Sequence, residues 1–174
     1  MSFSESKERE IIVFLVYMHH FGDVEVKEQV SLLMEALHVT KKNVFQSFDR
    51  WQALLPYTKK TEALLSEVSQ SYRPERLGLV EHAILQVATA EIQSDPQHFK
   101  RITADAIRLA RKYASPEAGA LVNALLDGLY RRSQGSLADG VAIQETMQAL
   151  EAAEAEVHAV HELRLAGTHP PTML

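Results

Sequence analysis

The stretch from Glu75 to Gln93, ERLGLVEHAILQVATAEIQ, is the most apolar of the long helical patterns in this chain. Its larger side chains recur at intervals of three and four residues, as Leu77, Val80, Ile84 and Val87. This spacing places them on one face of an α-helix. Further apolar residues widen that face: Ala83, Leu85, Ala88 and Ile92. An apolar surface of this width predicts a central helix with neighbours on several sides.

Towards the N-terminus, four shorter patterns also favour helices. Ile11, Leu15 and Met18 share one face of a helix that ends near His20 to Asp23. The β-branched run at residues 11–13 is also compatible with a buried strand, and the absence of another convincing strand favours the helix. Three further apolar stripes predict helices at about residues 25–38, from a cap at Thr40 to about Tyr57, and at 61–72.

Towards the C-terminus, the sequence predicts three more helices. Residues 102–113 carry an apolar face, and Ser115-Pro116-Glu117 is a strong helix start, because it combines an N-cap, a first-turn proline and an acid at the positive end of the helix. That helix carries an apolar stripe of Leu121, Val122, Leu125 and Leu129 and runs to Arg131-Arg132. After a Gly/Ser linker, a helix at about residues 137–166 has a thin stripe of Val141, Met147, Leu150, Val157 and Val160. The predicted fold class is all-α.

Composition and charge exclude several classes of function. The 174 residues suit one domain, and the absence of Cys excludes disulfides, thiolate zinc sites and Cys nucleophiles. The longest apolar run, residues 11–18, is far shorter than the roughly 20 residues of a membrane span, so we expect a soluble cytoplasmic protein with no membrane association. Residues 133–174 hold six acids and one base, which equals the net charge of −5, so the rest is neutral. A nucleic-acid site must therefore be local or completed by a partner.

Three stretches in register resemble the NusB family of transcription antitermination factors. They are RLGLVEHAILQVATAEI at 76–92, DAIRLARKY at 105–113 and LVNALLD at 121–127. Upstream, Arg9-Glu10 before an apolar helix that ends in Tyr17 resembles the Arg-Glu start of that family. The resemblance covers about residues 7–132. We therefore expect a NusB-like helical domain at 1–132, and a linker with an acidic helical extension at 133–174.

The resemblance implies an all-helical fold of two small bundles, plus the extra C-terminal helix. It implies binding of boxA RNA in the leaders of ribosomal RNA transcripts, jointly with NusE, a ribosomal protein of the small subunit. The pair helps RNA polymerase to read through terminators, without catalysis, metal or cofactor. Two alternatives remain open: a protein-interaction module of the same fold with weakened RNA binding, and a stand-alone relative of the NusB-like domain of RNA cytosine methyltransferases.

The same resemblance indicates seven candidate site residues. The candidates for RNA binding are Lys7, Arg9, Tyr17, Glu117 and Leu121, and those for partner binding are Glu81 and Glu91. Lys7 and Arg9 would contact phosphates from an exposed first turn, in a segment that is Arg-rich in the family but reads ESKER here. Leu121 occupies the position of a family aromatic. Because this chain lacks the Arg-rich segment and the aromatic of the family, we expect weak RNA binding that depends on the partner. The candidates also have structural interpretations: Lys7 and Arg9 as solvated charges on an exposed first turn, Tyr17 as a core-edge tyrosine, and Glu117 as a helix cap. Glu81 and Glu91 would instead satisfy backbone donors or pair with an arginine.

The C-terminal extension is expected to dock, because a helix with a narrow apolar stripe is only marginally stable alone. It would dock on its own domain or on a second copy, which makes a homodimer possible. His158 and His161 with Glu154 and Glu162 form the one arrangement that invites a metal test, but no second Glu-x-x-His accompanies them, so a polar helix face is expected.

Overall fold

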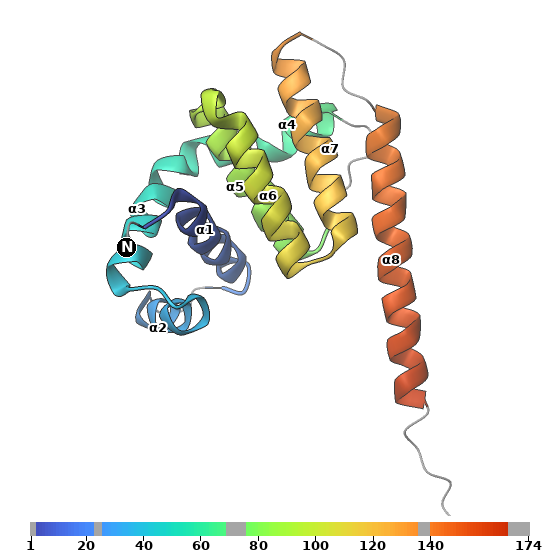
Figure 1. Ribbon diagram of the computed structural model, residues 1–174, viewed down its shortest axis with the longest axis horizontal. Coiled ribbons are helices and arrows are strands. Elements are labelled where there is room, and N and C mark those ends of the chain that lie inside the picture. The colour runs from blue at the N-terminus through green and yellow to red at the C-terminus, as the bar shows by residue number, and fades with distance from the viewer. Residues whose placement is uncertain (1–2, 23–25, 69–75, 136–139, 167–174) are drawn as a thin grey trace, which may run out of the picture.

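The computed structural model describes residues 3–22, 26–68, 76–135 and 140–166. In these ranges every regular element is helical, which confirms the predicted all-α class (Figure 1). The elements are α1 (Glu5–His19), α2 (Val26–Leu37), α3 (Lys41–Thr58), α4 (Thr61–Val68), α5 (Leu79–Ser94), the 3₁₀ turn η2 (Pro96–His98), α6 (Phe99–Tyr113), α7 (Pro116–Ser133) and α8 (Gly140–Ala166).

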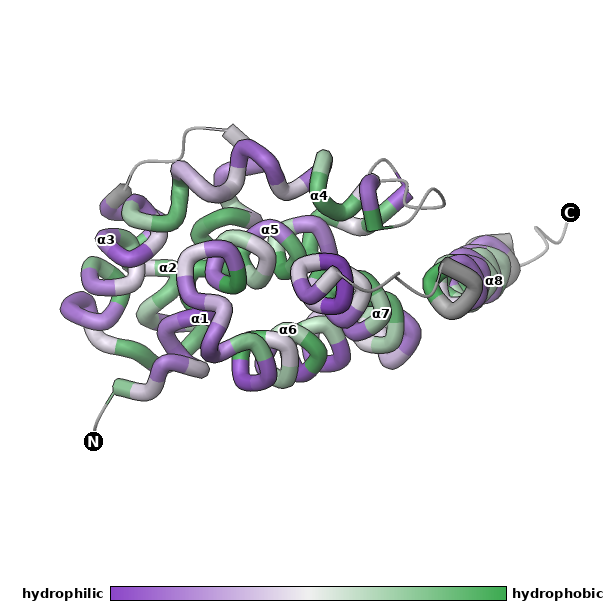
Figure 2. Tube along the Cα trace, turned by 90° about the horizontal axis from the view of Figure 1, so that it is seen from above, coloured by the Kyte–Doolittle hydropathy of each residue, from purple (hydrophilic) through white to green (hydrophobic). Residues whose placement is uncertain are grey.

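The helices form two hydrophobic cores that share α1. The smaller core joins α1, α2 and α3 through residues such as Ile11, Leu33 and Val44. The larger core is formed by α1 together with α4, α5, α6, α7 and α8. Within it, α5 supplies Ala83, Ile84, Leu85, Val87 and Ala88, and Gln86 is only partly buried. Viewed from above, α5 is surrounded by other helices (Figure 2). The wide apolar surface of the central stretch therefore indicated the central helix correctly.

Two predicted helix starts are present as capping structures. The Thr40 hydroxyl accepts a hydrogen bond from the Asn43 amide at 3.3 Å, and the Asn43 side chain accepts one from the Thr40 amide at 3.1 Å. At the start of α7, the Ser115 hydroxyl accepts from the Ala118 amide at 3.0 Å, with Pro116 in the first turn. These reciprocal and single caps satisfy amides that a helix start otherwise leaves unpaired.

Two helix boundaries differ from the sequence predictions. α5 begins at Leu79 rather than Glu75, because Gly78 is extended and the Glu81 carboxylate folds back over it, into the space that a side chain at 78 would need. α6 begins at Phe99, earlier than predicted, because η2 leads directly into it. The predicted boundaries at Tyr72, Glu75 and Leu137 lie outside the described residues.

α8 packs beside α7 through only its first half. Ile143, Met147 and Leu150 are buried, whereas Val157 is 70% exposed and Val160 is 45% exposed. Figure 1 shows the second half of α8 continuing past the other helices. The predicted stripe therefore docks in part, and the side chain of Val141 lies outside the described residues. Among the described residues, none of the helices combines the length and apolar character that a membrane span requires.

Candidate nucleic-acid interface

Arg9 lies at the centre of a buried ionic network that joins three helices. Its guanidinium, on α1, pairs with Glu91 on α5, where one contact measures 3.2 Å, and with Asp105 on α6. Arg50 of α3 approaches Glu91 at 3.8 Å, and the Ser6 hydroxyl donates to Asp105 at 2.7 Å. Arg9 is only 4% exposed. The expectation of an exposed phosphate contact is therefore wrong for Arg9, whose charge is used to hold α1, α5 and α6 together.

Glu10 organises a second network at the seam between α1 and α6. Its carboxylate accepts hydrogen bonds from Lys7 at 2.6 Å, Lys112 at 2.8 Å and the Tyr113 hydroxyl at 2.7 Å. Burial alone would raise the pKa of Glu10, but the three hydrogen bonds outweigh it and lower the pKa to about 2. The hydrogen bond to Glu10 also raises the pKa of Lys112. Lys7 remains partly exposed, so its ammonium is accessible at the surface.

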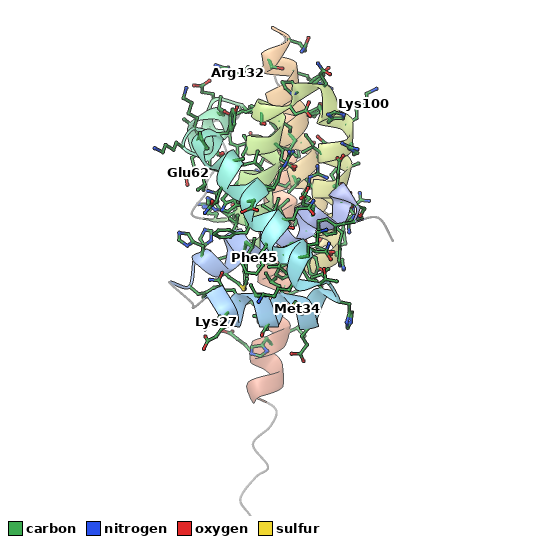
Figure 3. The ribbon with its side chains drawn as sticks, turned by 90° about the vertical axis from the view of Figure 1, so that its left-hand side faces the viewer. Lys27, Met34, Phe45, Glu62, Lys100 and Arg132 are labelled. Atoms are coloured by element: carbon green, nitrogen blue, oxygen red, sulfur yellow. The ribbon has the colours of Figure 1, made fainter. Side chains whose placement is uncertain are left out.

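The outer face of α6 is strongly basic. The helix carries five bases and the single acid Asp105, a net charge of +4. All five bases are exposed: Lys100, Arg101, Arg108, Arg111 and Lys112. Figure 3 shows the Lys100 side chain at the outer edge of the molecule. Arg108 also donates to the Ser6 hydroxyl at 3.0 Å, which ties this basic face to the start of α1.

A row of aromatic rings lies next to these cations. Phe14 contacts Tyr113 with ring centroids 4.9 Å apart, and Tyr17 contacts Phe21 at 5.1 Å. Phe14 and Tyr17 link the two pairs at 6.5 Å. The Lys112 ammonium lies 4.7 Å from the Tyr113 centroid, and Phe21 is 62% exposed. Cations for phosphates beside rings for stacking are what single-stranded RNA requires of a protein surface.

The two candidates near the start of α7, Glu117 and Leu121, differ in their exposure to solvent. Glu117 is in the first turn and partly exposed, so it is accessible to a ligand. Leu121 is fully buried in the larger core. A buried side chain has no surface on which a base can stack, so the proposed RNA contact of Leu121 is corrected to a packing role.

The two candidates for partner binding are also inside the protein. Glu91 is buried against Arg9, and Glu81 is buried where it folds back over Gly78. Neither carboxylate presents a face to another protein. Their position on the apolar helix α5 matches the structural interpretation, in which they pair with an arginine or complete a helix start.

Two of the sequence candidates, Lys7 and Tyr17, lie at this surface, but most of the residues around them were not singled out from the sequence. Phe14, Tyr17 and Phe21 follow the i, i+3, i+7 spacing of one helix face, which was a usable signal. The bases of 99–113 were a second signal, because one acid opposes five bases there. Among the described residues, no group of three or more His, Asp or Glu side chains is arranged to hold a metal ion.

The sequence of this chain is similar to those of known proteins over most of its length. Residues 6–131 match the model of the NusB family. The transcription antitermination protein NusB of Helicobacter pylori strain Shi470 is 26% identical over 129 residues, which is 74% of this chain and 94% of that protein. Its counterpart from Agathobacter rectalis is 29% identical over 126 residues, 71% of this chain and 96% of that protein.

A structural comparison agrees at the level of the fold. A protein chain in the crystal structure of a plectonemic RNA supercoil superposes with a TM-score of 0.63 and covers 75% of this chain and 96% of that one. The two sequences are 20% identical, so the likeness is one of fold. The family match ends before α8 begins.

Proposed function

This chain belongs to the NusB family, and on that premise we propose that it is a non-catalytic transcription antitermination factor that binds boxA-type RNA. The RNA is the leader of a ribosomal RNA transcript. The protein binds it together with the small-subunit ribosomal protein NusE, and the assembly lets RNA polymerase read through terminators. We place this antitermination function in the cytoplasm, where transcription takes place.

The observation that supports this function best is the aromatic row of α1 beside the basic face of α6. Tyr17 and Phe21 supply rings for stacking, while Lys7 and Arg108 supply cations at the same seam. A base stacked on an aromatic ring contributes about 1–3 kcal/mol, so these rings can supply sequence-tolerant affinity. Glu117 would accept hydrogen bonds from exocyclic amino groups of a base.

The position of the cations distinguishes this chain from what the family resemblance implies. An Arg-rich N-terminus is expected, but here Arg9 is buried and Lys7 is bonded to Glu10. The cations of α6 take over that role in our proposal. Because the whole chain carries −5, long-range attraction of RNA is weak, and a partner is needed for tight binding.

The test is a titration of boxA RNA across salt concentrations, with and without NusE. We expect weak binding alone and markedly tighter binding with NusE. The Arg101→Ala/Arg108→Ala variant should reduce the salt slope of log K by about 1.4, since each phosphate contact to a single strand contributes about 0.7. The matched control is Lys59→Ala/Lys60→Ala, which removes two exposed bases far along the chain from α6 and should leave the slope unchanged.

Equal affinity with and without NusE would contradict the dependence on a partner. An equal loss of slope in both variants would show that the α6 cations have no special position.

A second candidate function is favoured by the same buried groups. Arg9 is buried among carboxylates and Leu121 is packed in the core, so neither side chain is exposed for RNA to contact. A NusB-fold module that binds NusE but not RNA would keep both features. It is distinguished by a stable complex with NusE that boxA RNA neither joins nor strengthens.

A further inference from the structure

Glu10 is a buried carboxylate that holds two cations from different helices. It is 3% exposed, and it accepts hydrogen bonds from Lys7 of α1 at 2.6 Å and from Lys112 of α6 at 2.8 Å. Its pKa of about 2 keeps it ionised at neutral pH. The negative charge of Glu10 therefore offsets the repulsion between two ammonium groups that are held close together.

Both ammonium groups keep an exposed side. The Lys7 side chain is 32% exposed and that of Lys112 is 50% exposed, whereas the carboxylate between them is covered. An ammonium group has three N–H donors, so a hydrogen bond to Glu10 leaves donors for a ligand. Because both lysines are bonded to the same carboxylate, one anion at the surface can contact both. A phosphate of an RNA strand is such an anion, and lysine binds phosphate as a point charge.

The Tyr113 ring adds a flat surface beside these two cations. Its hydroxyl donates to Glu10 at 2.7 Å, and Phe14 packs edge-on against the ring with centroids 4.9 Å apart. The Lys112 ammonium lies 4.7 Å from the centroid of the Tyr113 ring. One carboxylate thus fixes a ring and two cations together, and this combination suits a nucleotide of a single strand.

We propose that Lys7 and Lys112 together hold one phosphate of the bound RNA, and that Glu10 is the positioning residue that keeps both lysines in place. This inference rests on the RNA-binding function proposed above. A lysine that is free in solvent loses rotamer freedom when it binds a ligand, and that loss weakens binding. Glu10 reduces the loss, because it orders both lysines before RNA arrives. Glu10 itself contacts no RNA.

Replacing both lysines tests whether they share one phosphate. Binding of labelled boxA RNA is measured with the protein alone, from low salt upwards. Each phosphate contact to a single strand contributes about 0.7 to the salt slope of log K, so Lys7→Ala/Lys112→Ala should reduce the slope by about 0.7. Two separate phosphates would instead give a loss of about 1.4. The matched control, Lys59→Ala/Lys60→Ala, removes two other exposed bases and should leave the slope unchanged.

The substitution Glu10→Asp separates position from charge. Aspartate keeps the negative charge but is one methylene shorter, so the three hydrogen bonds cannot all keep their present lengths. Glu10→Asp should weaken RNA binding by about tenfold, because two long side chains are left unordered. Added to Lys7→Ala/Lys112→Ala, it should change the affinity by less than about twofold, because the lysines through which it acts are absent. The matched control is Glu91→Asp, which shortens another buried carboxylate, bonded to Arg9, and should leave RNA affinity unchanged.

Glu10→Gln gives a second readout and serves if Glu10→Asp does not fold, as circular dichroism would show. It makes the chain more positive by one charge, yet it should bind RNA no more tightly than the unaltered chain, because its amide group cannot accept a hydrogen bond from Lys7. Tighter binding by Glu10→Gln would show that Glu10 only cancels lysine charge, and would overturn the proposal.

The remaining outcomes separate this proposal from the function on which it rests. Unchanged affinity of Glu10→Asp, an equal loss in Glu91→Asp, or an equal loss with and without the lysines would overturn the positioning role. A slope loss of about 1.4 in the lysine variant would overturn the shared phosphate. An unaltered chain that binds no RNA at low salt would overturn the proposed function, and this inference with it.

Discussion

Replacing Arg9 by Ala should destabilise the fold by about 3 kcal/mol, because removing one partner of a buried ion pair leaves an uncompensated charge. The usual cost is about 3–5 kcal/mol. The lower end applies here, since Arg50 lies 3.8 Å from Glu91 and partly compensates its charge. Asp105 also keeps the hydroxyl of Ser6 as a donor at 2.7 Å.

Urea unfolding followed by circular dichroism measures this loss. With an m-value of about 2 kcal/mol/M, the midpoint of the Arg9→Ala variant should fall by about 1.5 M. Adding Glu91→Gln should recover part of the loss, because the charge left unpaired by the first substitution is then absent. The matched control is Glu5→Ala, which breaks another pair between α1 and α6, with Arg101, but at the exposed surface. It should cost less than about 1 kcal/mol.

A cost of Arg9→Ala no larger than that of Glu5→Ala would contradict a stabilising role for the buried network. That result would mean that the Arg9 guanidinium is solvated in solution and available to RNA, as its place in the first turn suggested. A loss of RNA binding without a loss of stability would point in the same direction.

Three further outcomes follow from the same networks. The pKa of Glu10 is lowered from 4.5 to about 2, so its contribution to stability is present above about pH 4.5 and is lost as the pH falls through 2; Glu10→Gln should flatten that part of an acid-unfolding curve. Tyr113→Phe should cost about 1.5 kcal/mol in urea unfolding, because a hydrogen bond to a charged carboxylate is lost. Leu121→Ala should lower the free energy of unfolding by about 3 kcal/mol through the cavity it leaves, and an effect on RNA binding alone would contradict the burial of Leu121. Tyr17→Ala/Phe21→Ala should weaken RNA binding with a smaller change in stability.

Local signals predicted the helices well because the information that forms them is local. The caps at Thr40 and Ser115 are formed by residues within three positions of each other. The wide apolar surface of residues 79–94 likewise follows from composition and spacing alone. Periodicity also placed Leu121 on the apolar stripe of its helix, which agrees with its burial, whereas the family resemblance suggested a surface role.

The ionic networks could not be predicted in the same way. Arg9 reaches Glu91 and Asp105 across 82 and 96 residues of sequence, and no local pattern indicates which charge is buried. From sequence, Arg9 is one base among first-turn acids and is expected to be solvated. The length of α8 that packs on the bundle could not be predicted from the sequence either. The apolar stripe is regular from Met147 to Val160, but the neighbouring helix covers only its first part.

Recognition of boxA RNA by this chain can be measured in a competition experiment with the protein and NusE together at moderate salt. Labelled boxA RNA is bound to the complex and displaced by unlabelled boxA RNA or by a scrambled RNA of equal length and composition. We predict that boxA RNA displaces the label at a concentration at least about tenfold lower, a discrimination of roughly 1.4 kcal/mol. Equal displacement by the two RNAs would contradict a role for this chain in boxA recognition.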